Sequence, residues 1–154
     1  MSKNLTYAQS GVNIRSADKF VKFISKITSK QYKNQKQKNI GNFGSITKMP
    51  KNLQNVHLVA STDGVGTKIE IANELSRFNT IGIDLVAMSV NDILVQGGKP
   101  FIFLDYISIN KINQNKLKEI FKGIYKGCKI SQCELVGGET AEMPNTYSKG
   151  KFDI

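Results

Sequence analysis

The octapeptide Ser61-Thr62-Asp63-Gly64-Val65-Gly66-Thr67-Lys68 (STDGVGTK) concentrates in one place the groups that a metal-bound nucleotide requires. Gly64 and Gly66 carry no Cβ, so the backbone can turn sharply there and approach a ligand closely. Asp63 offers a hard oxygen of the kind that Mg²⁺ prefers, and Lys68 offers a compact positive charge suited to phosphate oxygens. The octapeptide favours a metal–nucleotide loop, and an ordinary Asp-Gly turn is the alternative.

Two well-known phosphate-binding loops do not match this stretch. A Walker loop has a Lys followed by Ser or Thr, whereas Thr67 precedes Lys68 here. The dinucleotide-binding fingerprint needs a third small residue where this chain has Ile69. The loop therefore belongs to a different scaffold.

Strands are expected on both sides of this loop. The apolar run Val56–Ala60 predicts a buried strand before it, and the alternation in Ile69–Leu75 favours a strand after it over a helix. Phe101–Ile109 predicts a central strand, and Glu134–Val136 a short strand. This last strand leads into a second glycine-led loop, Gly137–Pro144.

Helices are expected between these strands. Ser16 is predicted to cap an amphipathic helix that extends to Ile27, and Thr80 or Asp84 to open a mostly buried helix that ends at Gln96. Asn113 or Asn115 is predicted to cap a further helix, whose lysines form a solvated face. The order of elements predicts an α/β fold, a mixed sheet flanked by helices.

Composition predicts one ordinary globular domain in 154 residues, with Ser29–Asn39 as a mobile lysine-rich loop. No apolar run reaches the ~20 residues that span a bilayer, so a cytoplasmic location is expected. The net charge of +10 results from 22 basic and 12 acidic residues, and only Arg15 and Arg77 are arginines. This lysine bias indicates codon composition, and nucleic-acid binding is not expected. Cys128 and Cys133 are expected to be reduced thiols with a packing role.

Acidic residues gather in three further places. Asn91 and Asp92 interrupt an otherwise apolar helix, where a buried charge needs a cation or a lysine as its partner. Glu139 and Glu142 lie in the second glycine loop. Asp105 interrupts the central strand and is either a site residue or a hydrogen-bonded structural acid. Carboxylates converging with a lysine and exposed backbone amides would cradle Mg²⁺ and a polyphosphate.

Four stretches resemble aminoimidazole ribonucleotide synthetase, the cyclo-ligase family of purine biosynthesis. They are Ser61–Lys68, Thr80–Gln96 (TIGIDLVAMSVNDILVQ), Phe103–Tyr106 (FLDY) and Leu135–Pro144 (LVGGETAEMP). The resemblance implies an ATP-dependent ligase that phosphorylates the formyl amide oxygen of formylglycinamidine ribonucleotide. The amidine nitrogen then closes the imidazole ring, and aminoimidazole ribonucleotide, ADP and phosphate are released. It further implies ATP and Mg²⁺ as cofactors, and a homodimer whose two N-terminal domains share a sheet.

The resemblance also implies roles for individual residues. It assigns catalysis to Lys68, Asp92 and Glu139, and metal binding to Asp63, Asp84 and Asp92. It assigns substrate contacts to Thr140 and Glu142. The nucleotide-binding residues that it implies are Asp63, Gly64, Val65, Gly66, Thr67, Lys68, Asn91, Gly137 and Gly138.

The sequence departs from the family pattern in several places. The family's glycine-rich segment is reduced to Ile40–Gly44, and Asn13 and Arg15 stand where acids are usual. Residues 1–154 correspond to the N-terminal ATP-binding and dimerisation domain, and the family's C-terminal domain is absent from the sequence. The chain alone is therefore expected to form a homodimer without closing the ring. The alternatives are an inactive dimerisation fragment, or a related ATP-using enzyme such as selenophosphate synthetase, thiamine-monophosphate kinase or formylglycinamidine ribonucleotide synthetase.

Overall fold

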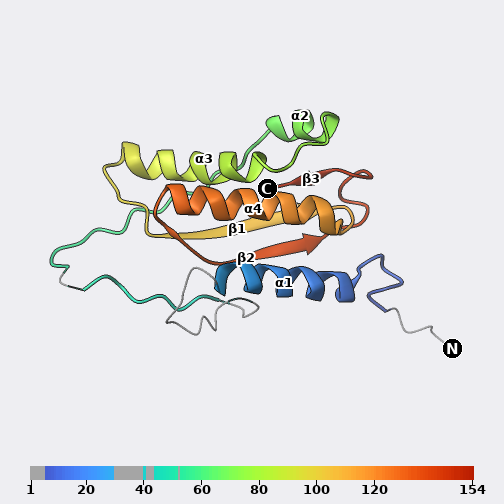
Figure 1. Ribbon diagram of the computed structural model, residues 1–154, viewed down its shortest axis with the longest axis horizontal. Helices are drawn as coiled ribbons and strands as arrows, with labels where there is room; N and C mark the ends of the chain where they lie inside the picture. The colour runs from blue at the N-terminus through green and yellow to red at the C-terminus, as the bar shows by residue number, and fades with distance from the viewer. Residues whose placement is uncertain (1–5, 30–39, 41–43, 52) are drawn as a thin grey trace.

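Three long helices lie along one face of a small sheet, and a shorter helix follows the glycine loop (Figure 1). The computed structural model of the chain describes residues 6–29, 40, 44–51 and 53–154. Its helices and its mixed three-stranded sheet confirm the predicted α/β fold. The elements are α1 (Ile14–Ser29), α2 (Lys68–Glu74), α3 (Ile81–Val95), β1 (Ile102–Ile109), α4 (Gln114–Ile130), β2 (Glu134–Glu142) and β3 (Phe152–Asp153).

The sheet has the order β2-β1-β3, with β1 parallel to β2 and antiparallel to β3. The predicted central strand is confirmed. The second glycine-led segment is not a loop, because β2 continues through it as far as Glu142, which pairs with Ile109. A register shift between Phe103 and Leu104 absorbs one extra residue, so that Gly137 still pairs with Leu104. Pairing with a neighbouring strand thus extends β2 beyond what its own composition indicates.

The two faces of β1 have different surroundings. Phe103, Asp105 and Ile107 are buried toward the helices. Ile102, Leu104 and Tyr106 point the other way and remain 42%, 57% and 53% exposed. We call the side of β1 that bears these three residues the open face. The buried core therefore lies between the sheet and the helices, and its most buried members include Leu117, Ile120, Phe121, Ile124 and Leu135.

Helix α4 packs between α3 and α1, as Figure 1 shows. The backbones of α3 and α4 approach closely at Gly82, where a Cβ would lie 2.2 Å from the carbonyl oxygen of Ile120. Cys128 and Cys133 are free and buried, which confirms their predicted packing role. A hydrogen bond between the two thiols raises the pKa of Cys128 and lowers that of Cys133.

The predicted helix starts need two corrections. Asn13 rather than Ser16 caps α1, because the backbone amide of Ser16 donates to the Asn13 side-chain oxygen at 3.0 Å. Residues after the glycine loop form helix α2 and not the strand that was predicted for Ile69–Leu75. Ile69 and Ala72, three residues apart, are both buried, so one helical stripe packs inward. Of the two predicted caps of α4, the structure has Asn113 and not Asn115, and the Asn113 side chain accepts from two backbone amides.

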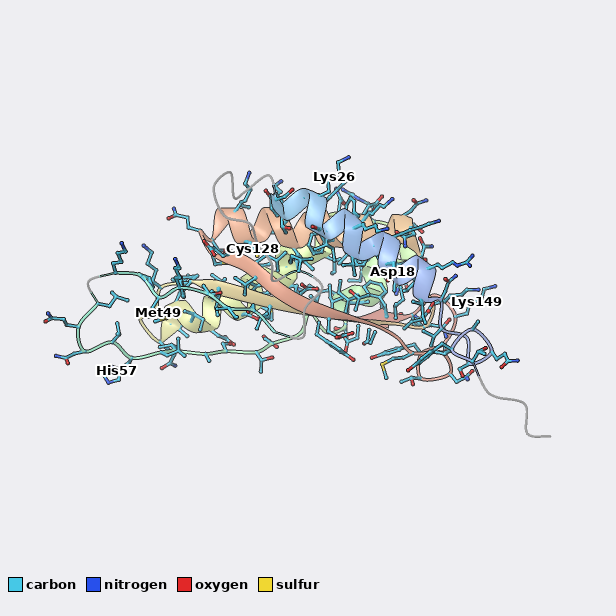
Figure 2. The ribbon with its side chains drawn as sticks, turned by 90° about the horizontal axis from the view of Figure 1, so that it is seen from below. Asp18, Lys26, Met49, His57, Cys128 and Lys149 are labelled. Carbon is cyan, nitrogen blue, oxygen red and sulfur yellow. The ribbon has the colours of Figure 1, made fainter. Side chains whose placement is uncertain are left out.

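The predicted strand Val56–Ala60 is absent, and this run is extended, irregular and exposed. Val56 is 57% exposed and Leu58 is 80% exposed. The run pairs with no strand in the described part of the chain, and hydrophobicity alone cannot supply such a partner. Figure 2 shows His57, the chain's single histidine, on this run and pointing away from the helices.

Three further expectations concern other segments. Residues 30–39 and 41–43 lie outside the described residues, so most of the predicted mobile loop Ser29–Asn39 and of the segment Ile40–Gly44 is not covered. Helix α3 has the predicted bounds, but its last turn is not buried, since Val95 is 79% exposed. Among the described helices, none combines the length and the apolar character needed to cross a membrane.

Candidate functional site

The glycine octapeptide runs along one face of α3. Its first residue, Ser61, donates its hydroxyl to Asp92 at 3.1 Å, and its last, Lys68, forms an ion pair with Asp84 at 3.7 Å. Asp84 and Asp92 are eight residues apart, which places them on the same helix face about 12 Å from each other. The structure thereby brings the first glycine loop and the acidic face of α3 together.

The middle of the octapeptide is anchored at Val65, which is buried between two exposed glycines. The Val65 amide donates to the backbone oxygen of Ile154 at 3.2 Å, and Gly66 has φ +72°, a conformation that favours glycine. Asp63 turns one carboxylate oxygen back to the amide of Gly64 at 2.8 Å. The loop is therefore held from behind while its polar groups stay accessible.

The carboxylates of this region are exposed in the described structure. Asn91 and Asp92 lie on the surface of α3, so the expectation of a buried charge was wrong: water solvates this helix face. Among the described residues, no three His, Cys, Asp or Glu side chains gather into a group that could hold a metal. Mg²⁺ is commonly bound through one or two carboxylates together with phosphate oxygens and water. Asp63 and Asp92 are carboxylates of the type that could supply one or two such ligands. Ser61 links them, because it lies two residues before Asp63 and donates its hydroxyl to Asp92.

The predicted residues of the second glycine segment lie elsewhere on the sheet. Gly137, Gly138, Glu139 and Thr140 belong to β2, whereas the glycine loop is anchored to Ile154 beyond β3. Since β1 separates β2 from β3, the two sets are about 10 Å apart or more. In the described part of the chain, no hydrogen bond or ion pair joins them. The single chain does not assemble all the predicted site residues in one place.

Glu142 has a structural task that its sequence position did not reveal. One carboxylate oxygen accepts the Ile112 amide at 2.8 Å, and the other accepts the Asn13 amide at 2.5 Å. A carboxylate that receives two backbone N–H groups ties the end of β2 to the start of α1 and to the segment before α4. Its predicted contact with substrate stays a prediction.

Asp105 lies on the helix side of β1 and pairs with Gly138 of the neighbouring strand β2. A Cβ on Gly138 would be 2.3 Å from the Asp105 carboxylate, so only glycine leaves room there. Burial raises the pKa of Asp105 to about 7, and the nearby charge of Glu139 contributes further. Asp105 is thus a buried acid that titrates near neutral pH.

The contacts of two residues, Ser61 and Lys116, are not predicted by the sequence pattern. The sequence pattern does not predict the contact of Ser61 with Asp92, although a hydroxyl that precedes a glycine loop is a signal for such a contact. The sequence pattern of α4 predicts that Lys116 is solvated, but its ammonium donates hydrogen bonds to Asn73 and Gly150. A cavity of about 480 Å³ opens beside Lys116, and none of the predicted site residues lines it.

Comparison with known proteins gives consistent matches. Residues 49–154 match the family described as AIR synthase related protein, N-terminal domain. A phosphoribosylformylglycinamidine cyclo-ligase of Crocosphaera subtropica is 47% identical over 150 residues, covering 97% of this chain and 44% of its own length. Proteins of the same name from Desulfatibacillum aliphaticivorans and Neisseria meningitidis serogroup B are 46% and 44% identical, each covering 100% of this chain and 45% of the relative. The chain therefore spans less than half the length of these relatives.

Proposed function

Because the chain belongs to the AIR synthase related protein family, we propose that residues 1–154 form the N-terminal domain of a phosphoribosylformylglycinamidine cyclo-ligase. The observation that carries the proposal is the pair of contacts, Ser61 with Asp92 and Lys68 with Asp84, that holds the glycine loop against α3. A loop with exposed glycines, one lysine and adjacent carboxylates suits a nucleotide triphosphate with its metal. Two free thiols are compatible with a cytoplasmic, reducing compartment.

The proposed reaction closes an imidazole ring at the expense of ATP. The γ-phosphoryl group passes to the formyl amide oxygen of formylglycinamidine ribonucleotide, which gives ADP and a phosphorylated imidate. The amidine nitrogen attacks the activated carbon, the C–O bond breaks with loss of phosphate, and a proton leaves the ring nitrogen to give aminoimidazole ribonucleotide. Chemistry of this kind depends mainly on positioning and on neutralising charge.

The residues of the chain divide between these tasks. Lys68 would meet the phosphate oxygens, and the amides around Gly64 and Gly66 would approach the nucleotide. Asp63 and Asp92 would hold Mg²⁺, which when bound neutralises phosphate charge. Asp84 keeps Lys68 in place through their ion pair and stays a secondary candidate for the metal. The remaining predicted contacts are Val65, Thr67, Asn91, Gly137 and Gly138 for nucleotide, Glu139 for catalysis, and Thr140 and Glu142 for substrate.

The proposed partner in assembly is a second copy of this chain. The open face presents Ile102, Leu104 and Tyr106, and Val56 and Leu58 are exposed as well. A monomer gains nothing from apolar side chains held in water, whereas a second open face would bury them. Such a dimer would also supply neighbours for the extended run that contains Val56 and Leu58.

A change at Asp63 tests the proposed site. Asp63→Asn keeps the size of the side chain and the bond to the Gly64 amide but removes the charge. We expect Mg-ATP binding, measured by calorimetry, to weaken on the order of ten-fold or more. Glu74→Gln alters an exposed carboxylate of α2 and serves as the matched control. Equal Mg-ATP affinity in the wild type and in Asp63→Asn would remove Asp63 from the site.

The substrate is tested separately from the nucleotide. ADP release should increase with formylglycinamidine ribonucleotide and not with selenide, thiamine monophosphate or formylglycinamide ribonucleotide. Because the chain spans under half of its relatives, the assay is run on the 154-residue chain and on the full reading frame. Binding of Mg-ATP without ADP release in either protein would favour the alternative, a non-catalytic nucleotide-binding and dimerisation module.

A further inference from the structure

Lys116 reaches from the first turn of α4 to two other parts of the chain. Its ammonium donates to the side-chain oxygen of Asn73 in α2 at 3.0 Å and to the backbone oxygen of Gly150 at 2.9 Å. It also lies 4.5 Å and 4.8 Å from the ring centroids of Phe78 and Phe152, whose faces attract a cation. One side chain thereby ties together α2, α4 and the segment that leads into β3.

The segment that Lys116 holds is the support of the glycine loop. Two residues after Phe152, the backbone oxygen of Ile154 accepts the amide of Val65 at 3.2 Å. The same oxygen lies 3.3 Å from the position of a Cβ on Gly64. Lys151 forms a second tie, an ion pair with Glu70 in α2. Residues 150–154 are thus fixed to α4 and α2 at one end and support the loop at the other.

The cost of burying Lys116 offsets part of what its contacts contribute to overall stability. Burial and the nearby charge of Lys151 lower the pKa of Lys116, which means that its ammonium is less favoured here than in water. Its neighbour Lys118 offers a contrast on the same helix: its ammonium lies 5.5 Å from the ring centroid of Phe23, on the side of α1. Lys118 therefore has a comparable aromatic contact but no connection to residues 150–154 among the contacts of the described residues.

We propose that Lys116 is a positioning residue for the glycine loop. By holding Gly150 and Phe152, it keeps the Ile154 oxygen where it supports the Val65 amide, and the loop is ordered before nucleotide arrives. A loop that is already ordered loses less conformational entropy on binding, so Mg-ATP binds more tightly. This effect on ATP rests on the proposed function, whereas the effect on the loop itself does not.

Hydrogen exchange at the Val65 amide tests the loop directly. Lys116→Met keeps an apolar stem over the two rings and removes the donated hydrogen bonds, and Lys118→Met is the matched control. We expect Val65 exchange to rise on the order of ten-fold in Lys116→Met and to stay unchanged in Lys118→Met. The thermal midpoint of Lys116→Met should stay close to that of the wild type, because the loss of two hydrogen bonds and the removal of a partly buried ammonium act in opposite directions. Mg-ATP affinity, measured by calorimetry, should weaken about five-fold to ten-fold.

The outcomes separate the two proposals. Unchanged Val65 exchange in Lys116→Met would overturn the positioning role, whether or not ATP binds. Faster exchange throughout the chain, with a lower thermal midpoint, would overturn it as well, because Lys116 would then be a general stabiliser. Faster Val65 exchange with unchanged Mg-ATP affinity would refute the link to binding. If the wild type binds no Mg-ATP while Val65 responds as expected, the proposed function fails and the positioning of the loop stands.

Discussion

Asp105 carries its carboxyl group into the apolar layer between β1 and the helices, where only its protonated form is readily accommodated. The carboxyl group of Asp105 lies against the backbone of Gly138 in β2, because Gly138 has no side chain to separate them. Lys116 is the second charge withdrawn from water, and its pKa moves in the opposite sense because burial disfavours the charged form of either group. At the scale of single residues, burial is the main cause of the pKa shifts of Asp105 and Lys116.

Asp105 should make stability fall as pH rises. Its folded pKa of about 7 exceeds the ordinary value of 3.8, so the folded state binds the proton more tightly than the unfolded state. The stability it contributes is complete below about pH 4 and is lost as pH rises through about 7, on the order of 4 kcal/mol in total. Asp105→Asn should lack this loss. The free energy of unfolding of Asp105→Asn minus that of the wild type, measured in denaturant titrations, should therefore increase from about pH 4 to about pH 8.

A control at a different carboxylate tests whether the effect is specific to Asp105. Asp18→Asn changes an exposed side chain of α1, which Figure 2 labels, and should follow the wild-type pH profile. Parallel profiles for Asp105→Asn and the wild type would show that Asp105 does not titrate in this range.

At the scale of elements, the contact between α3 and α4 sets the position of the acidic face against which the glycine loop lies. This contact depends on small residues: Gly82 meets the backbone of α4, and a Cβ on Gly127 would lie 2.8 Å from Val86. Because the backbones of α3 and α4 touch, α4 holds α3 in place. The positions of Asp84 and Asp92 relative to the glycine loop therefore depend on this contact. The helix pair is therefore part of the site although it contributes no catalytic group from α4.

Gly82→Ala should force α3 and α4 apart. The new methyl group would lie 2.2 Å from a backbone oxygen, which cannot move aside as a flexible side chain can. We expect a loss of about 3 kcal/mol in the free energy of unfolding and weaker Mg-ATP binding, measured by denaturant titration and calorimetry. Gly44→Ala is the control, since its Cβ would meet nothing within 4 Å. A Gly82→Ala protein as stable as the wild type would contradict the packing described.

At the scale of the whole molecule, the described helices pack on one side of the sheet, and no described helix covers the open face on the other side. The open face presents apolar side chains to water, and so does the extended run before the glycine loop, whose backbone lies at the left of Figures 1 and 2. An uncovered sheet face of this kind is rare in stable monomers. The distribution of apolar surface is therefore the main argument for assembly.

A charge on the open face should prevent the proposed dimer. Leu104→Lys places an ammonium at the centre of the surface that a second copy would bury, where its desolvation costs several kcal/mol. We expect the wild type to sediment as a dimer at micromolar concentration and Leu104→Lys as a folded monomer. Ile130→Lys alters another exposed apolar residue, at the end of α4, and should remain dimeric. A monomeric wild type, or a dimeric Leu104→Lys protein, would refute assembly through this face.

Several parts of this protein depend on local chemistry alone and can be predicted from neighbouring residues. Gly64 and Gly66 allow a sharp backbone turn because they lack a Cβ. The apolar patterns of α1, α4 and β1 and the cap at Asn113 likewise depend on residues close in the sequence, and the structure has these features where they were predicted. Other features need a partner that is distant in the chain, and these follow only from the tertiary structure. β2 runs on through its glycines because β1 pairs with it, and the apolar run Val56–Ala60 stays irregular because no described strand does. Glu142 and Lys116 gained their roles from backbone groups far away in the chain, which no local pattern can encode.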